Sequence, residues 1–213
     1  MASSLKDSRC DQPASPEPAW EIATLFPPQG EWSEAAYLSF TESLGQFVEL
    51  VDGSIEVPAM PTKTHQQIVH ALLAMLLGFL RASHAGDAVA APYRMRLREG
   101  TFREPDVAVY TTEHLDRFGE RYGEPADIVI EVVSDDAASR VRDYEDKRRD
   151  YATAGVPEYW IVDPSAGRVL VLALSENGYA VAADCGLADD VSSRVLPGFT
   201  VAVAAVLLKD STG

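Results

Sequence analysis

The chain has 213 residues, of which 46% are hydrophobic, and this size and composition suit a single α/β domain with a sizeable core. Its 18 basic and 33 acidic residues give a formal net charge of −15, which argues against indiscriminate binding to a polyanion. The two cysteines lie far apart without metal-binding spacing, and the N-terminal residues lack a hydrophobic signal core. The longest apolar run is much too short to span a membrane, so we expect a cytoplasmic protein.

Residues 1–19 are rich in Ser, Pro and charge. Such a composition cannot bury enough apolar surface to fold, so we expect a disordered N-terminal tail followed by one domain over residues 20–213. Near the start of this domain, Ser33 is a suitable cap for a short helix that runs to Phe40.

Asp52-Gly53 predicts a β-hairpin, because this dipeptide is a strong signal for a two-residue turn between strands. The two strands would cover residues 47–51 and 54–57. Glu49 lies on the first of them, and the simplest interpretation of Glu49 is an acid that faces solvent.

Residues 64–82 carry the longest helical pattern in the chain. Apolar residues recur at helical spacing and form a stripe that would face the core: Ile68, Leu72, Met75, Leu76 and Phe79. His65 lies near the start of this helix, where a neutral imidazole can cap the helix, pair with an acid or face a metal. His70 lies off the stripe, and we expect it on the surface.

Arginines alternate with apolar residues near the end of a strand predicted over residues 88–97. Arg94, Arg96 and Arg98 would therefore share one face of the strand. One interpretation is the solvated face of an edge strand. The other is a short basic track for a phosphate backbone, which would make these arginines a nucleic-acid contact.

Two short β-branched runs each carry one carboxylate where a sheet normally holds an apolar side chain. Asp106 opens the first run, and Glu131 lies inside the second. Because runs that are apolar on both faces belong to strands covered on both sides, an ionised carboxylate there is costly unless its charge is compensated. A divalent metal held by both acids is the simplest such compensation. The structural alternatives are a turn at Asp106 and a buried ion pair at Glu131.

Residues 140–154 predict a helix, which Gly155 would end. Asp143, Lys147 and Tyr151 step by four and stack on one side. The apolar and aromatic positions suit one buried face (Val141, Tyr144 and Tyr151). If this helix crosses back over the preceding strand, Lys147 comes near Glu131. A lysine beside paired carboxylates and a metal suits phosphodiester hydrolysis, because it can orient water or neutralise developing charge. The alternative is a solvated Lys147 that pairs only with Asp143.

The remaining chain predicts further strands and a second hairpin. A strand over residues 159–162 precedes two strands over residues 168–174 and 179–183, which flank the turn signal Asn177-Gly178. The apolar C-terminal residues would close the sheet or pack beneath it. The sequence contains no phosphate-binding loop, zinc-ligand spacing or nucleophile-elbow motif.

Taken in order, these motifs resemble those of the Uma-type restriction endonucleases, a family of the PD-(D/E)XK nuclease superfamily. The resemblance runs from about Trp32 to Phe199. It is carried by Glu49-Leu-Val-Asp-Gly53, His65, Pro105-Asp106, Glu131-Val-Val-Ser134, Asp143 with Lys147 and Tyr151, and Gly155-Val-Pro-Glu-Tyr-Trp-Ile-Val-Asp-Pro164. The resemblance implies an α/β nuclease core and magnesium-dependent cleavage. It assigns Asp106, Glu131 and Lys147 to the active site, with Glu49 and His65 as neighbours.

One position departs from the superfamily pattern, which has a lysine two residues after the second acid on the same strand. Val133 occupies that position here. The lysine must then come from elsewhere, and Lys147 of the predicted helix is the candidate.

We therefore expect a single restriction-endonuclease-like domain of the α/β type, with a central mixed (α+β) sheet, helices on both faces and added β-hairpins. The expected function is Mg²⁺-dependent hydrolysis of DNA, with Mn²⁺ able to replace Mg²⁺. Asp106 and Glu131 would hold the metal, and Lys147 would orient the attacking water. A homodimer would suit cleavage of two strands.

Two other functions stay open. The acidic balance favours a catalytically silent or regulatory protein that keeps the fold for self-association. A hydrolase of small phosphoesters would also suit the charge, and it would need a closed pocket where a nuclease needs an open groove.

Overall fold

The computed structural model describes residues 26–44 and 47–207. The tail expected over residues 1–19 and the domain boundary at residue 20 lie outside the described residues. In chain order the helices and strands are α2 (Glu34–Leu44), β1 (Glu49–Val51), β2 (Ser54–Glu56), α3 (Lys63–Ser83), β3 (Gly86–Ala90), β4 (Met95–Arg98), β5 (Thr101–Arg103), β6 (Val107–Thr111), a 3-10 turn (Thr112–Arg117), β7 (Ile128–Val132), α4 (Ala137–Val141), a π-helical turn (Arg142–Asp146), α5 (Lys147–Thr153), β8 (Glu158–Asp163), β9 (Arg168–Ser175), β10 (Gly178–Gly186), β11 (Asp190–Ser192), β12 (Thr200–Ala202) and α6 (Val203–Leu207).

A six-stranded mixed sheet forms the centre of the molecule, in the order β10-β9-β8-β7-β6-β3. The neighbours β7 and β8 are parallel, and the other neighbouring pairs are antiparallel. Every residue of β7 and β8 is buried, which agrees with strands that are apolar on both faces. A parallel pair needs a long crossover connection, and the helical segment from α4 to α5 supplies it. The predicted central mixed sheet is confirmed.

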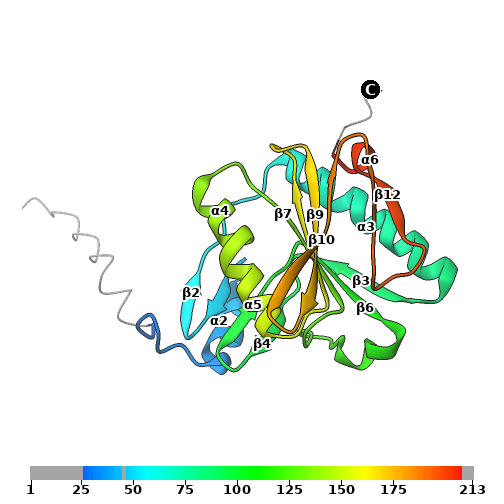
Figure 1. The fold of residues 1–213 in the computed structure, drawn as a ribbon. Coiled ribbons are helices and arrows are strands. Elements are labelled where there is room, and N and C mark those ends of the chain that lie inside the picture. The colour runs from blue at the N-terminus through cyan, green and yellow to red at the C-terminus, as the bar shows by residue number, and fades with distance from the viewer. Residues whose placement is uncertain (1–25, 45–46, 208–213) are drawn as a thin grey trace, which may run out of the picture.

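Helices cover the two faces of this sheet, as predicted. On one face α3 packs its buried residues, among them Leu72 and Leu76, against Val109 of β6 and Ile130 of β7. On the other face Tyr151 of α5 joins a second apolar cluster from the alternate positions of the same strands. Figure 1 shows α3 on one side of the strands and the α4–α5 segment on the other.

Helix α3 agrees closely with the predicted helix. Thr62 caps its N-terminus by accepting a hydrogen bond from the amide of His65, and the helix runs from Lys63 to Ser83. Its length and composition alone would also suit a membrane span, but a core helix meets the same criteria. The five buried residues at helical spacing give it a core-facing side (Ile68, Val69, Leu72, Leu76 and Leu80).

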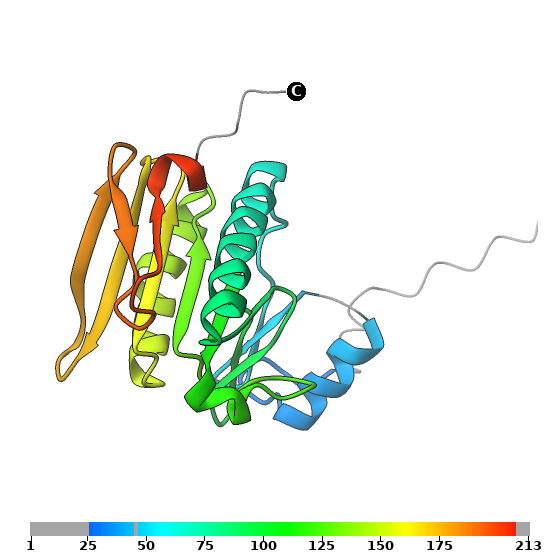
Figure 2. The same cartoon turned by 90° about the vertical axis from the view of Figure 1, so that its right-hand side faces the viewer.

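The second sheet has four strands in the order β2-β1-β5-β4. Strands β1 and β2 form the predicted hairpin, and Asp52 and Gly53 at its turn have φ of 47° and 75°. Positive φ at both positions is what the two-residue turn requires, which explains the Asp-Gly pair. Figure 2 shows that α2 and this sheet lie at the end of the molecule away from β9 and β10.

The prediction of a single strand over residues 88–97 is wrong. The structure divides it into β3, which belongs to the central sheet, and β4, which belongs to the second sheet. Pro92 lies between them, and proline has no N–H group to donate to a ladder of strand hydrogen bonds. This break lets the chain pass from one sheet to the other beside the site described below.

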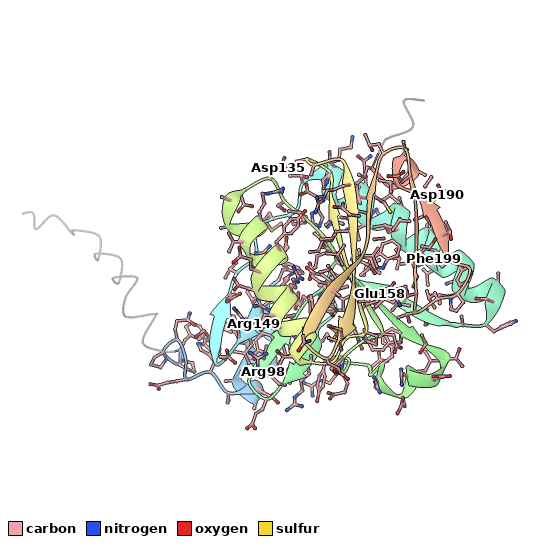
Figure 3. All side chains as sticks on the ribbon, in the orientation of Figure 1. Arg98, Asp135, Arg149, Glu158, Asp190 and Phe199 are labelled. Atoms are coloured by element: carbon pink, nitrogen blue, oxygen red, sulfur yellow. The ribbon has the colours of Figure 1, made fainter. Side chains whose placement is uncertain are left out.

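The C-terminal part packs beneath the central sheet. This is one of the two arrangements predicted from the sequence. Strands β9 and β10 form the second predicted hairpin, and β11 pairs with β12 in a separate two-stranded sheet. Phe199 and Val203 belong to the same apolar cluster as α3. Figure 3 labels Asp190 and Phe199 in this region, on the α3 side of the molecule.

Candidate active site

A cavity of about 250 Å³ lies where the N-terminus of α3, the end of β7 and the π-helical turn meet. One side of it is charged, and the residues are His65, Glu104, Asp106, Arg142 and Lys147. The facing side is formed by the loop between β2 and α3. A neighbouring hollow of about 580 Å³ shares Ala59, Met60, His65 and Ser134 with the cavity and continues to Ser165. The two hollows therefore adjoin each other.

Asp106 stands at the entrance to β6, next to the strand that carries Glu131. Its Oδ2 accepts a hydrogen bond of 2.7 Å from the amide of Val132, and its Oδ1 lies 2.9 Å from Nε2 of His65. Because β6 and β7 are neighbours, the two acids that lie far apart in the sequence come together. The charge of Asp106 contributes to the raised pKa of Glu131.

Lys147 contacts Glu131 directly. Its Nζ lies 2.7 Å from Oε1 of Glu131, and both side chains are 4% exposed. The predicted crossing of the helix over its preceding strand is therefore confirmed. Asp143 lies 3.8 Å from the same Nζ, but Lys147 is not on a solvated face, so the alternative of a solvated pair is wrong. The buried ion pair suggested for Glu131 is present, as part of a larger cluster of charges.

The helix that carries Lys147 is not a uniform α-helix. It begins at Ala137, where Asp136 caps it through the amide of Ser139, and it contains a π-helical turn over Arg142–Asp146. Such turns are rare and are frequently found at functional sites. The predicted polar stripe is confirmed, since Asp143, Lys147 and Tyr151 are all buried.

Tyr151 lies on the buried side of this helical segment, and Val141 lies on its exposed side. The Tyr151 hydroxyl donates a hydrogen bond of 2.5 Å to Oε1 of Glu131. Val141 is 50% exposed, so its expected position on the buried face is wrong. The buried side is filled by charged and hydrogen-bonding groups of the site, which leaves Val141 outside.

Glu49 belongs to the site, and its interpretation as a solvent-facing acid is wrong. The residue is 0% exposed. Its Oε2 lies 2.7 Å from Arg103, its Oε1 accepts from the amide of Glu104, and Oε1 also lies 3.6 Å from Nζ of Lys147. These cations and the amide compensate the buried charge, and they all come from distant parts of the chain.

His65 pairs with an acid, one of its three predicted roles, through the contact with Asp106. Burial alone would lower the pKa of His65, but the hydrogen bond and the charges of Asp106, Glu131 and Asp143 outweigh burial and raise it. His70 is exposed, as expected.

Sequence reasoning missed Arg103 and Glu104. Arg103 is 1% exposed and contacts carboxylates from three elements: Glu49, Glu56 and Asp150. Glu104 is 2% exposed, and its Oε1 lies 3.5 Å from Nε of Arg94. The available signal was a pair of charges directly before Pro105-Asp106, of which Arg103 is the last residue of the buried strand β5.

Burial raises the pKa of two acids of the site. Burial, followed by the charges of Asp106, Asp143 and Glu49, raises the pKa of Glu131 to about 8 despite the opposing effect of Lys147. Burial likewise raises the pKa of Glu104 to about 7. An added cation beside these acids would lower their pKa and favour the charged carboxylates.

The donors fit a hydrated magnesium ion more closely than a metal held by protein alone. Among residues 26–44 and 47–207 there is no group of three or more His, Cys, Asp or Glu side chains arranged to hold a metal ion. Mg²⁺, however, commonly keeps several waters and uses one or two carboxylates. Asp106 lines the cavity, and the described contacts of the buried Glu131 both use Oε1. Oε2 of Glu104, which also lines the cavity, is buried without a hydrogen-bond partner in the described part of the chain.

The three arginines in β4 or just before it all form ion pairs within the chain. Arg94 pairs with Glu104, Arg96 with Glu34 at 3.0 Å, and Arg98 with Asp52 at 2.9 Å. Strand β4 is at the edge of its sheet, and its arginines alternate with buried Met95 and Leu97, as predicted. These contacts favour the structural interpretation of the arginines over a free basic track.

Asp163 at the end of β8 anchors the helical segment that carries Lys147. Its Oδ2 accepts hydrogen bonds from Arg140 of α4 at 2.7 Å and from Tyr144 of the π-helical turn at 2.8 Å. Its Oδ1 accepts from Ser165 and from the amide of Ala166. Burial alone would raise the pKa of Asp163, but these hydrogen bonds outweigh it and hold the pKa well below its usual range.

Replacing Asp163 by Asn is expected to lower the free energy of unfolding at pH 7 by about 2 kcal/mol, the order for hydrogen bonds to a charged group. A lowered pKa stabilises the folded state above the unfolded pKa of about 3.9, and this contribution is lost as the pH falls towards the lower folded pKa. Urea unfolding should therefore show a constant difference from pH 7 to about 5 and a smaller one below about pH 4. The same difference at pH 3 and pH 7 would contradict this account.

A mixed sheet with a helix on each face, and two acids and a lysine gathered at one end of it, defines the class of restriction-endonuclease-like nuclease folds. The chain belongs to the Uma2 family, described as "Putative restriction endonuclease", whose model matches residues 32–204. No curated protein matches the chain.

Among solved structures, the chain is similar to one from Anabaena variabilis, described as "a putative nuclease belonging to DUF820". The TM-score is 0.64 at 17% sequence identity, over 80% of this chain and 96% of the other. At this identity the likeness establishes a shared fold.

Proposed function

We propose that this protein is a metal-dependent endonuclease that hydrolyses DNA phosphodiester bonds, with Asp106 and Glu131 holding Mg²⁺ and Lys147 orienting the attacking water. The observation that carries the proposal is the contact of 2.7 Å between Lys147 and Glu131, beside a cavity lined by Asp106. The lysine comes from a helix, and it still reaches the second acid. Val133, at the usual lysine position, is 2% exposed and packs in an apolar cluster.

Each residue of the site would have a distinct task. A divalent ion, when bound, polarises the phosphate and lowers the pKa of a coordinated water. The ammonium of Lys147 orients the attacking water and stabilises negative charge that develops on the phosphate. His65 fixes the orientation of Asp106, and Tyr151 fixes that of Glu131, through their hydrogen bonds.

Two other functions were considered, and the site supports them less well. A hydrolase of small phosphoesters would need a closed pocket, whereas this cavity is partly open and adjoins a larger hollow that reaches Ser165. A catalytically silent protein would have no need to keep a buried lysine among three buried carboxylates (Glu49, Glu131 and Asp143) beside a cavity lined by Asp106, an arrangement that is costly without compensation. A homodimer stays a prediction.

The test is cleavage of supercoiled plasmid by the full-length protein with Mg²⁺, with Mn²⁺ and with EDTA. Bis(p-nitrophenyl) phosphate serves as the small substrate. Nicking or linearisation that needs the metal, without comparable turnover of the small ester, would support the proposal. Metal-dependent hydrolysis of the small ester alone would favour the phosphoester hydrolase, and inactivity on both would favour the silent protein.

A further inference from the structure

The uncharged wall of the cavity is an apolar loop. This rim loop, Val57-Pro-Ala-Met-Pro61, joins β2 to α3, and in Figure 1 it is the cyan segment near α4. Met60 is 85% exposed and Val57 is 72% exposed, more than any other large hydrophobic residue in the described part of the chain. Pro58 and Pro61 restrict the backbone on either side of Met60. Apolar side chains are therefore held in water at the mouth of the site.

These five consecutive residues are all apolar, and contiguous exposed apolar surface often marks a ligand contact, whereas single exposed apolar residues are ordinary. Pro58, Ala59, Met60 and Pro61 line the same cavity as Asp106 and Lys147. A strand whose phosphate lies at the acids would therefore lie close to this loop. The loop has no charged side chain, so its side chains suit an apolar or aromatic group better than a phosphate.

The cations near the cavity are already paired with acids. Lys147 contacts Glu131, Arg142 lies 3.3 Å from Asp143, and Arg94 lies 3.5 Å from Glu104. The chain has a net charge of −15. Duplex binding draws most of its affinity from many cation–phosphate contacts, and these surroundings do not favour it.

We propose that the rim loop binds an unpaired nucleobase next to the scissile phosphate, so that the substrate is a single-stranded or locally unpaired stretch of nucleic acid. This inference rests on the proposed nuclease function. In a duplex the flat faces of the bases are covered by their neighbours, whereas an unpaired base exposes them. Methionine and proline are among the side chains that proteins insert against base steps, and the methionine sulfur contacts aromatic rings favourably.

Fluorescence anisotropy tests this inference by measuring how three labelled DNA probes bind to the Glu131→Gln variant. The probes are a single-stranded 12-mer, its duplex, and the same single strand with abasic residues at its centre, which keeps every phosphate. We expect the base-bearing single strand to bind about tenfold more tightly than the abasic strand, the order of one lost stacking contact. We also expect a shallow salt dependence, with a slope of magnitude about 1–2, because few phosphates are contacted.

Met60→Ser should remove most of the difference between the base-bearing and abasic strands, and Met60→Leu should keep it. Val181→Ser is the matched control, because Val181 is 60% exposed on β10 and does not line the cavity. The exposure of Met60 makes it suitable for substitution without loss of folding, and a thermal melt checks this.

The outcomes separate this inference from the proposed function. Equal binding of the abasic and base-bearing strands, or preferred binding and cleavage of the duplex, would overturn the inference and leave the nuclease intact. A change in oligomeric state on Met60→Ser, by light scattering, with unchanged DNA binding would assign the loop to self-association and also overturn it. No binding to any probe, together with no metal-dependent cleavage by the wild type, would overturn both.

Discussion

Replacing Lys147 by Gln is expected to lower the rate of metal-dependent DNA cleavage by about 10²–10³-fold, by analogy with the loss of one oxyanion donor. The ammonium lies 2.7 Å from Glu131 and 3.6 Å from Glu49, and Lys147 lines the cavity, so it is a positive group in direct contact with a proposed metal ligand. Glutamine keeps a hydrogen-bond donor and removes the charge. Single-turnover cleavage of a labelled oligonucleotide, with a thermal melt of each variant, measures the effect.

Arg149→Gln is the matched control for Lys147. Arg149 is two positions further along the same helix, is 71% exposed, and forms an ion pair with Asp146 on the same helical segment. Figure 3 shows Arg149 beside α5, on the exposed side of the helix. Its replacement should leave the cleavage rate within about twofold of wild type. Wild-type activity in Lys147→Gln would show that the lysine assignment is wrong and that the acids act with another group.

Replacing Arg103 by Met is expected to lower the free energy of unfolding by about 3–5 kcal/mol, because removing one partner leaves buried charges uncompensated. Arg103 lies 2.7 Å from carboxylate oxygens of Glu49, Glu56 and Asp150. It therefore joins the β1–β2 hairpin and α5 through β5. Native domains are stable by only about 5–15 kcal/mol, so this is a large fraction of the total. Urea unfolding measures the loss.

Two variants control the Arg103 experiment. Arg103→Lys keeps the charge but loses the planar contacts, so it should show an intermediate loss. Arg121→Gln removes an arginine that is 61% exposed from its pair with Glu42, and this should change stability by less than about 1 kcal/mol. A loss in Arg103→Met as small as that in Arg121→Gln would contradict the central role given to Arg103.

Local patterns were sufficient where a short stretch of sequence determines the structure. The Asp52-Gly53 turn, the α3 helix and the helix end at Gly155 follow from turn chemistry, apolar periodicity and left-handed backbone positions, and the structure has all three. The meeting of Lys147 and Glu131 also followed, because a parallel pair of strands forces its connecting helix back over the sheet.

Local patterns failed where the compensating group is far away in sequence. Glu49 was expected to face solvent, because no residue near it in the sequence indicates that Arg103 and Lys147 neutralise its charge. The same limit hid Arg103, whose partners lie on three separate elements. Val141 was placed on the buried face by its apolar character, but the buried side of that helix is polar because it faces the site.

The most direct test of the central claim is the effect of Mn²⁺ on the thermal stability of the wild type and of Glu131→Gln. A ligand that binds only the folded state at about 100 times its dissociation constant stabilises by about 2.7 kcal/mol, which corresponds to roughly 5–10 °C for a domain of this size. The account predicts this rise in the wild type and its loss in Glu131→Gln, because Glu131 and Asp106 hold the ion together. An equal rise in both proteins, or none in either, would contradict a metal site at Asp106 and Glu131.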